Sequence, residues 1–237
     1  MIRVLVTRPE PGASRTARRL EAQGFEPVLL PLTETTALPF DRAAIPDAVA
    51  VAVTSASAVR HAPKGLVAAL AALPCHAVGK RTADACRAAG FSIVDEGPGN
   101  AEALADAIAA SLAGKEIVYL CGRVRFAGFE ERLAAAGVKV HAIETYDTIE
   151  VDHGDADMLA RLSGGTVEAV LLYSAKATAA LARLIARPAM RRFFETSEFL
   201  ALSARVAKPL DGIAAPRIRI ASRPDEDALL ELLSQSG

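Results

Sequence analysis

Short apolar runs alternate with segments of helical period along most of the chain. In residues 13–24, for example, Ala13, Ala17 and Leu20 share one helical face and Gly24 supplies the stop. Apolar strands separated by such helices predict an α/β fold with parallel sheets covered on both faces, and ligands of open sheets bind beyond the carboxyl ends of the strands. The predicted strands are residues 3–7, 26–30, 49–54, 75–78, 91–94, 116–120, 139–144, 168–173, 199–202 and 217–220.

Two Thr-rich passages, residues 31–46 and 144–155, break this alternation and have the pattern of exposed strands. If they pair as a ribbon, the chain leaves a first unit, builds a second and returns, and the ribbon can act as a hinge. The alternative is two sequential domains divided near residue 125. The predicted divisions are a discontinuous domain of residues 1–33 plus 150–237, an inserted domain of residues 37–143, and linker strands at about 31–37 and 144–151.

Three internal similarities indicate that the two units share an architecture. A Ser-Ala turn occurs at Ser55 and again at Ser174, and the turn at Gly79 aligns with that at Ser203. Residues 5–30 also align with residues 118–143. General α/β alternation without a repeat is the alternative explanation.

Composition narrows the function. Hydrophobic residues make up 51%, charged residues 23%, and the formal net charge is −1, so we expect no general attraction to nucleic acid or membrane. No apolar run reaches the roughly 18 residues of a membrane span, and the charged strand "MIRVLVTRPE" is unlike a signal peptide. Neither the cysteines (Cys75, Cys86, Cys121) nor the histidines (His61, His76, His141, His153) have metal-ligand spacing. We therefore expect a cytoplasmic protein without metal or disulfide.

Signatures of several enzyme classes are absent. The chain has no glycine-rich dinucleotide fingerprint after the first strand, no Walker A sequence and no Gly-x-Ser-x-Gly elbow. Glu130 and Glu131 lie on a helix-like segment and are expected to be solvated, so no carboxylate pair for acid–base work is evident. No nucleotide cofactor is predicted.

The turns that follow the strands predict anion binding. A helix that starts directly after a strand offers free backbone N–H groups and the positive end of its dipole. Simple N-capping by the serines, and solvation of the cations, are the alternatives. Clustered cations at strand ends would suit a ligand with many carboxylates or phosphates, bound between the domains. The candidate residues are Thr7, Arg8, Ser55, Ser57, Gly79, Lys80, Arg81, Gly122, Arg123, Arg125, Ser174, Lys176, Arg205 and Lys208.

Five motifs together, over almost the whole chain, resemble the uroporphyrinogen-III synthase family: "LVTRPEPGA", "VTSASAV", "AVGKRTADACRAAGF", "YDT" and "YSAKA". The resemblance implies two flavodoxin-like α/β domains joined by a two-stranded β-ladder. It also implies a cofactor-free, monomeric lyase of tetrapyrrole biosynthesis, on the route to porphyrins and haem. Such enzymes convert hydroxymethylbilane, a linear tetrapyrrole with carboxylates on every ring, into uroporphyrinogen III, with loss of water and inversion of the last ring.

The resemblance also assigns roles to residues. Tyr146 falls on the family's best catalytic candidate, a proton donor near the departing hydroxyl, with a structural ribbon aromatic as the alternative. Thr82 falls on a hydrogen-bond donor to a substrate carboxylate. The corresponding family turn near residue 203 is altered, because Ser203, Arg205 and Val206 stand where Gly and threonines are usual.

A non-catalytic bilobal module that binds or senses a tetrapyrrole or another polyanion is the alternative function. For the enzyme, the resemblance leaves open a transient contact with the preceding enzyme of the pathway, and implies neither a nucleic-acid nor a membrane partner.

Overall fold

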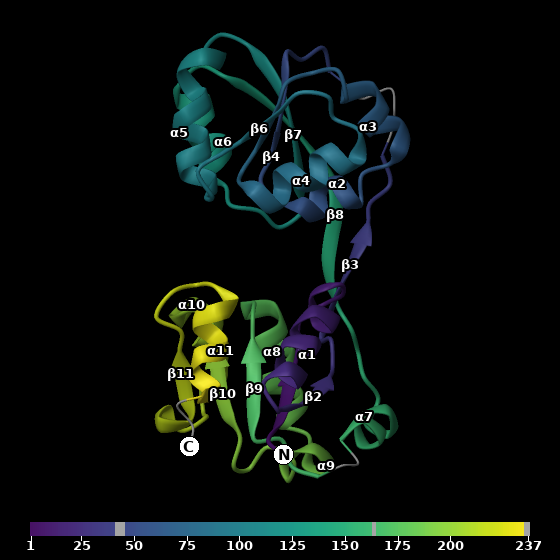
Figure 1. The fold of residues 1–237 in the computed structure, drawn as a ribbon, viewed down its shortest axis with the longest axis vertical. Helices are drawn as coiled ribbons and strands as arrows, with labels where there is room; N and C mark the ends of the chain where they lie inside the picture. The colour runs from purple at the N-terminus through teal and green to yellow at the C-terminus, as the bar shows by residue number, and fades with distance from the viewer. Residues whose placement is uncertain (41–45, 163–164, 235–237) are drawn as a thin grey trace. The chain divides into compact units, whose positions relative to one another are not determined.

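The computed structural model describes residues 1–40, 46–162 and 165–234 (Figure 1). The chain divides into two compact units, residues 1–34 with 149–237 and residues 35–148. Each unit is built on its own largely parallel sheet with helices on both faces, so the predicted α/β class is confirmed.

The first unit contains a five-stranded sheet of order β11-β10-β9-β1-β2, in which every pairing is parallel. Along β1, Val4 and Val6 face the core under α1 and α11, while Leu5 faces the core under α8, because side chains alternate across a strand. The strands are β1 (Arg3–Val6), β2 (Glu26–Leu29), β9 (Ala169–Leu172), β10 (Glu198–Ala201) and β11 (Ile218–Ile220). The helices are α1 (Gly12–Ala22), α7 (Asp155–Arg161), α8 (Ala175–Ile185), α9 (Pro188–Arg191), α10 (Ala204–Ala207) and α11 (Glu226–Ser234).

The second unit is built on a sheet of order β3-β8-β7-β4-β5-β6. Val51 and Val53 of β4 face the core under α2, α3 and α4, while Ala50 and Ala52 face the core under α5 and α6. The strands are β3 (Thr33–Ala37), β4 (Ala50–Val53), β5 (Cys75–Ala77), β6 (Val94–Glu96), β7 (Glu116–Gly122) and β8 (Lys139–Glu150). The helices are α2 (Ala56–Arg60), α3 (Lys64–Leu70), α4 (Lys80–Ala89), α5 (Ala101–Leu112) and α6 (Gly128–Ala135).

Two predicted strands differ most in extent from the observed ones. The strand expected over residues 91–94 begins at Val94, because Gly90 ends α4 with φ +112° and Phe91 then donates its N–H back to the carbonyl of Cys86 at 3.1 Å. The strand expected over 139–144 continues to Glu150, so β8 includes most of the Thr-rich linker passage.

β3 and β8 form an antiparallel ladder where the chain passes between the units. Leu38 donates its N–H to the carbonyl of Thr145 at 3.0 Å, and Val151 donates to that of Leu32 at 3.1 Å. Because the partner numbers run in opposite directions, the strands are antiparallel. A hinge at this ladder stays a prediction.

The two units are circular permutations of one architecture. Counted along the chain, the first sheet has the strand order 2-1-3-4-5 of flavodoxin. Matching β7 and β8 with β1 and β2, and β4, β5 and β6 with β9, β10 and β11, gives the same spatial order in the second sheet. This correspondence explains the three internal similarities, since Ser55 follows β4 as Ser174 follows β9.

Candidate functional site

The predicted serines cap the helices that follow their strands. Ser55 accepts a hydrogen bond from the N–H of Ser57 at 3.2 Å, and Ser174 accepts one from the N–H of Ala177 at 3.2 Å. Ser203, in the corresponding turn of the first unit, accepts from the N–H of Val206 at 3.4 Å. The N-cap alternative thus describes the contacts that these hydroxyls make, and an anion at these turns would meet the remaining backbone N–H groups.

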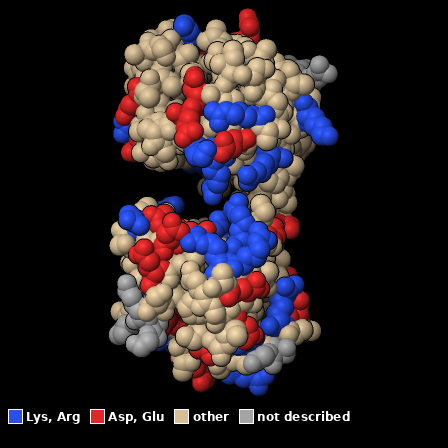
Figure 2. Space-filling model, in the orientation of Figure 1, with Lys and Arg blue, Asp and Glu red and all other residues tan. Residues whose placement is uncertain are grey.

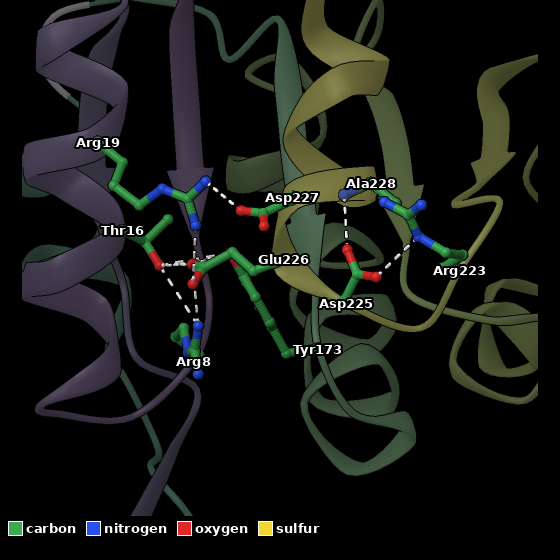
Figure 3. A network of polar contacts seen from close by, with 9 residues as sticks. All are labelled: Arg8, Thr16, Arg19, Tyr173, Arg223, Asp225, Glu226, Asp227 and Ala228. Atoms are coloured by element: carbon green, nitrogen blue, oxygen red, sulfur yellow. Dashed lines mark hydrogen bonds and ion pairs between the residues drawn. The ribbon is translucent and has the colours of Figure 1, made fainter. Parts of the chain in front are cut away.

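Arg8 lies in an internal polar network of the first unit (Figure 3). Its guanidinium donates to the Glu226 carboxylate at 3.0 Å and lies 4.3 Å from the centre of the Tyr173 ring. The same carboxylate accepts from the hydroxyl of Thr16, from Tyr173 at 3.2 Å and from Arg19 at 3.3 Å. A ligand carboxylate would therefore compete with Glu226 for Arg8.

This network shifts the pKa of its members. Burial raises the pKa of Glu226, but the Thr16 hydrogen bond and the charges of Arg8 and Arg19 outweigh burial and hold it below its ordinary value. Burial raises the pKa of Tyr173 to about 12 despite the hydrogen bond to Thr16. At neutral pH the network thus combines a carboxylate, two guanidinium groups and a neutral phenol.

Thr7 also serves the fold of the first unit. It is fully buried, and its hydroxyl donates to the carbonyl of Leu171 in β9 at 2.8 Å. This bond joins the carboxyl ends of two neighbouring strands.

In the second unit, Arg123 and Arg125 follow β7 and are also paired. Arg125 donates to both oxygens of Glu130, at 2.8 and 3.3 Å, and to Glu144 at 2.9 Å. Arg123 donates to Glu144 at 3.3 Å and to Asp147 at 3.2 Å. The hydrogen bond to Glu130 raises the pKa of Arg125 above its ordinary value. The expectation that Glu130 is merely solvated is wrong, because it is the bidentate partner of Arg125.

Tyr146 lies directly against Gly122. A Cβ atom on Gly122 would come within 2.6 Å of the Tyr146 ring carbon Cζ and 2.9 Å of its hydroxyl oxygen, so only glycine admits the ring in this position. The Tyr146 carbonyl accepts the N–H of Arg123 at 2.9 Å, which ties the loop after β7 to β8. The structure therefore brings together two predicted site residues at the carboxyl end of β7.

A register shift in the β7–β8 pairing aims Tyr146 at Gly122. Cys121 pairs with Glu144, whereas Gly122 pairs with Tyr146, so Thr145 is an extra residue in β8. The Thr145 side chain is fully buried, and its hydroxyl donates to the carbonyl of Ala58 in α2 at 2.7 Å. His61, just after α2, lies 5.9 Å from Tyr146 between ring centres.

The start of α4 has no side-chain cap. Gly79 occupies the N-cap position, and a Cβ there would be 3.2 Å from the Cα of Gly99, so the backbone packs closely at this turn. Thr82 is buried in the first turn, and Lys80 is exposed with an ion pair to Asp84 at 3.6 Å. The N-cap residue of α4 therefore offers no side-chain oxygen to the backbone N–H groups of the first turn.

The predicted cations differ in how far they are exposed. Arg8 and Arg125 are mostly buried and bonded to carboxylates, whereas Lys80, Lys176 and Arg205 are exposed. Figure 2 shows Lys and Arg side chains next to Asp and Glu on the visible face of each unit. The exposed cations are better placed to meet a ligand anion than Arg8 and Arg125, whose partly buried carboxylate partners a ligand would have to displace.

Comparison with known proteins identifies the family. The sequence profile described as "Uroporphyrinogen-III synthase HemD" matches residues 14–231, nearly the whole chain. The chain belongs to the uroporphyrinogen-III synthase family. Searching curated proteins by sequence gave no match.

Solved structures agree with this family at the level of the fold. The uroporphyrinogen-III synthetase of Helicobacter pylori aligns with a TM-score of 0.67 and 17% identity, covering 99% of each chain. A mutant uroporphyrinogen III synthase from Thermus thermophilus aligns with a TM-score of 0.55 and 17% identity, covering 99% of this chain and 98% of that one.

A tetrapyrrole substrate fits the synthase family. Among the described residues, no group of three or more His, Cys, Asp and Glu side chains could hold a metal ion, and no helix is long and apolar enough to cross a membrane. The cysteines Cys75, Cys86 and Cys121 are buried free thiols. A groove of about 940 Å³ lies between α2, α3 and α4, but no candidate site residue of the synthase lines it except Arg81.

Sequence reasoning missed the acidic partners and one neighbour of Tyr146. Glu226 and Glu144 were not among the predicted residues, although they hold Arg8 and Arg125. A sequence signal existed only for Glu130, which lies five positions after Arg125, within reach across the start of a helix. His61 had no signal beyond following the Ser-Ala turn.

Proposed function

We propose that this chain is a uroporphyrinogen-III synthase, a lyase that closes hydroxymethylbilane to uroporphyrinogen III with loss of water and inversion of the terminal pyrrole ring. The observation that carries the proposal is the fixed contact of Tyr146 with Gly122 in a chain whose profile match spans residues 14–231. The family match favours an enzyme over a non-catalytic binding module.

Tyr146 is suited to donate a proton to the departing hydroxyl. Its ring is partly exposed and held against the Gly122 backbone, and its hydroxyl has no partner among the described residues. When the terminal C–O bond breaks, the Tyr146 proton joins the departing hydroxyl to form water, and the electron pair of the pyrrole nitrogen, which keeps its proton, makes an azafulvenium ion (protonated azafulvene). Ring closure through a spiro intermediate and rearrangement then releases a proton from carbon, which returns to Tyr146.

Positioning supplies the other part of the rate and all of the isomer choice. Unassisted azafulvene closes without inversion, so the protein must hold the chain with the last ring turned over. The start of α4, where the N-cap residue Gly79 has no side chain to cap the helix, is suited to bind substrate carboxylates in the second unit, together with Thr82 in the first turn and the exposed Lys80. In the first unit, Lys176 and Arg205 are exposed beside the starts of α8 and α10.

We further assign the enzyme to the cytoplasm, as a monomer that needs no cofactor and that contacts the preceding enzyme of its pathway transiently. Size measurement by light scattering, with and without that enzyme, tests the monomeric state and the transient contact.

The activity test supplies hydroxymethylbilane and separates the porphyrin isomers after oxidation. We expect type III product well above the uncatalysed background, and type I alone would refute the proposal. Tyr146→Phe should slow formation of isomer III by about 10- to 100-fold, the scale of a lost proton donor. Tyr119→Phe is the control, because that tyrosine is fully buried and its hydroxyl contacts Thr54 at 2.6 Å.

A further inference from the structure

The loop between β7 and α6 exposes two apolar side chains beside the candidate site. Val124 is 77% exposed and Phe126 is 50% exposed, and Phe126 is the one aromatic residue among the exposed large hydrophobics of the described chain. Single exposed apolar residues are common on protein surfaces. Two of them in one three-residue stretch, directly after a strand that ends at Gly122, call for a specific explanation.

This loop is held in place by polar contacts at both ends. The N–H of Arg123 donates to the carbonyl of Tyr146 at 2.9 Å, and Arg125 joins Glu130 of α6 to Glu144 of β8. The side chains of Arg123 and Arg125 make the ion pairs of this loop, and those of Val124 and Phe126 take no part in them. A rigid loop of this kind presents its apolar side chains at little cost in entropy when a ligand binds.

Phe126 itself lies on a glycine. A Cβ atom on Gly128 would come within 2.4 Å of the ring carbon Cζ and 2.6 Å of Cε1 of Phe126. The same arrangement occurs at the other end of the loop, where the Tyr146 ring lies on Gly122. Each end of the loop thus has a glycine that lets an aromatic ring lie close to the backbone while its other face stays available.

We propose that Phe126, supported by Val124, binds the face of one pyrrole ring of the linear tetrapyrrole and positions it at the carboxyl end of β7. This inference rests on the proposed function. A pyrrole ring has a flat apolar face that pairs with a phenyl ring in offset-stacked or edge-to-face geometry. Arg125 then acts as a positioning residue for the loop, which accounts for a buried cation bonded to two carboxylates in a site built for an anionic substrate.

The test compares Phe126→Ala with Ile93→Ala in steady-state assays of the full chain, with hydroxymethylbilane generated in place and isomers separated. Ile93 is also 50% exposed and belongs to the same unit, but it precedes β6 at the amino ends of the strands. We expect KM for Phe126→Ala to rise by about tenfold, the fold-change given by the upper end of an aromatic pair energy, with kcat changed less than about threefold. The share of type I product should rise too, because unassisted closure competes with a slower enzyme.

Gly128→Ala provides a second variant that keeps the phenyl ring but displaces it. We expect its KM to rise in the same direction, while Phe126→Leu restores part of the loss and Ile93→Ala matches the wild type. Kinetics of Phe126→Ala equal to those of Ile93→Ala would overturn the inference. Failure of the wild type to form isomer III would instead refute the proposed function, so the two failures are distinguishable.

Discussion

Removing the charge of Glu226 tests whether the polar network around Arg8 stabilises the fold of the first unit. In Glu226→Gln, the amide can still accept from Thr16 or Tyr173, but Arg8 and Arg19 lose their common anion. The side chains of Arg8, Glu226 and Arg19 are 18%, 25% and 38% exposed, so the site lies between a surface and a buried ion pair.

The magnitude follows from these exposures. Breaking a buried pair costs about 3–5 kcal/mol and an exposed pair about 0–1 kcal/mol, so for this partly exposed network we expect a loss of about 2 kcal/mol in the free energy of unfolding. That loss corresponds to a roughly 30-fold increase in the opening equilibrium of α11 and α1. The assay is hydrogen exchange of peptides from these helices, which reports on the first unit alone. Asp227→Asn is the matched control, since Asp227 is the next residue of α11 and its side chain is 73% exposed.

The pH dependence gives an independent check with a definite sign. The folded-state pKa of Glu226 is lowered, so its contribution is fully present above the unfolded value of about 4.3 and is lost as pH falls through the folded value. The difference in protection between wild type and Glu226→Gln should therefore be constant near pH 7 and shrink below about pH 4. Equal protection of Glu226→Gln and Asp227→Asn at pH 7 would show that the network contributes nothing, and the structural role of Arg8 would fall with it.

Three further predictions address the rest of the molecule. Gly122→Ala should displace the Tyr146 ring and lower kcat for isomer III by about tenfold or more with little change in the far-UV spectrum; a normal kcat would contradict the fixed contact. Arg205→Ala should raise KM more at low than at high salt, because Arg205 is exposed, and a salt-independent KM would exclude a charge role. In a 295 nm titration, a late phase near pH 12 should lose amplitude in Tyr119→Phe and in Tyr173→Phe, since burial raises both pKa values to about 12; unchanged late amplitude would refute their burial.

The alternation of apolar runs with segments of helical period was sufficient to predict the fold, because the strands of a sheet covered on both faces are continuous apolar runs. All the predicted runs contain or overlap an observed strand, and the internal similarities signalled a shared architecture. The errors occur where tertiary context decides an element's length. Phe91 belongs to the end of α4 rather than to β6, and β8 continues past Glu144 because β3 supplies a partner for its polar residues.

The sequence predicts which turns hold the candidate site, but it does not predict the contacts among the residues of those turns. Strand ends can be counted from the sequence, which points to Gly122, whereas Tyr146 was named from the resemblance to the synthase family. Their contact depends on the register shift after Cys121, which inserts Thr145 and reverses the side to which the following residues point. No sequence pattern in this segment marks that shift, because Thr145 alternates with its neighbours as an ordinary strand residue would.

The pairing of the arginines has a similar cause, and it changes how a charged site should be inferred from a sequence. Arg8 and Glu226 are 218 positions apart and meet because β1 and the start of α11 lie at the same edge of the sheet. Parallel α/β folds gather helix starts at the strand ends, and acidic residues favour the first turn of a helix. The same topology that collects cations at this edge therefore also collects carboxylates to neutralise them. Counting basic residues at strand ends overestimates the charge offered to a ligand, and the exposed cations beside helix starts, such as Lys80 and Arg205, are the more informative candidates.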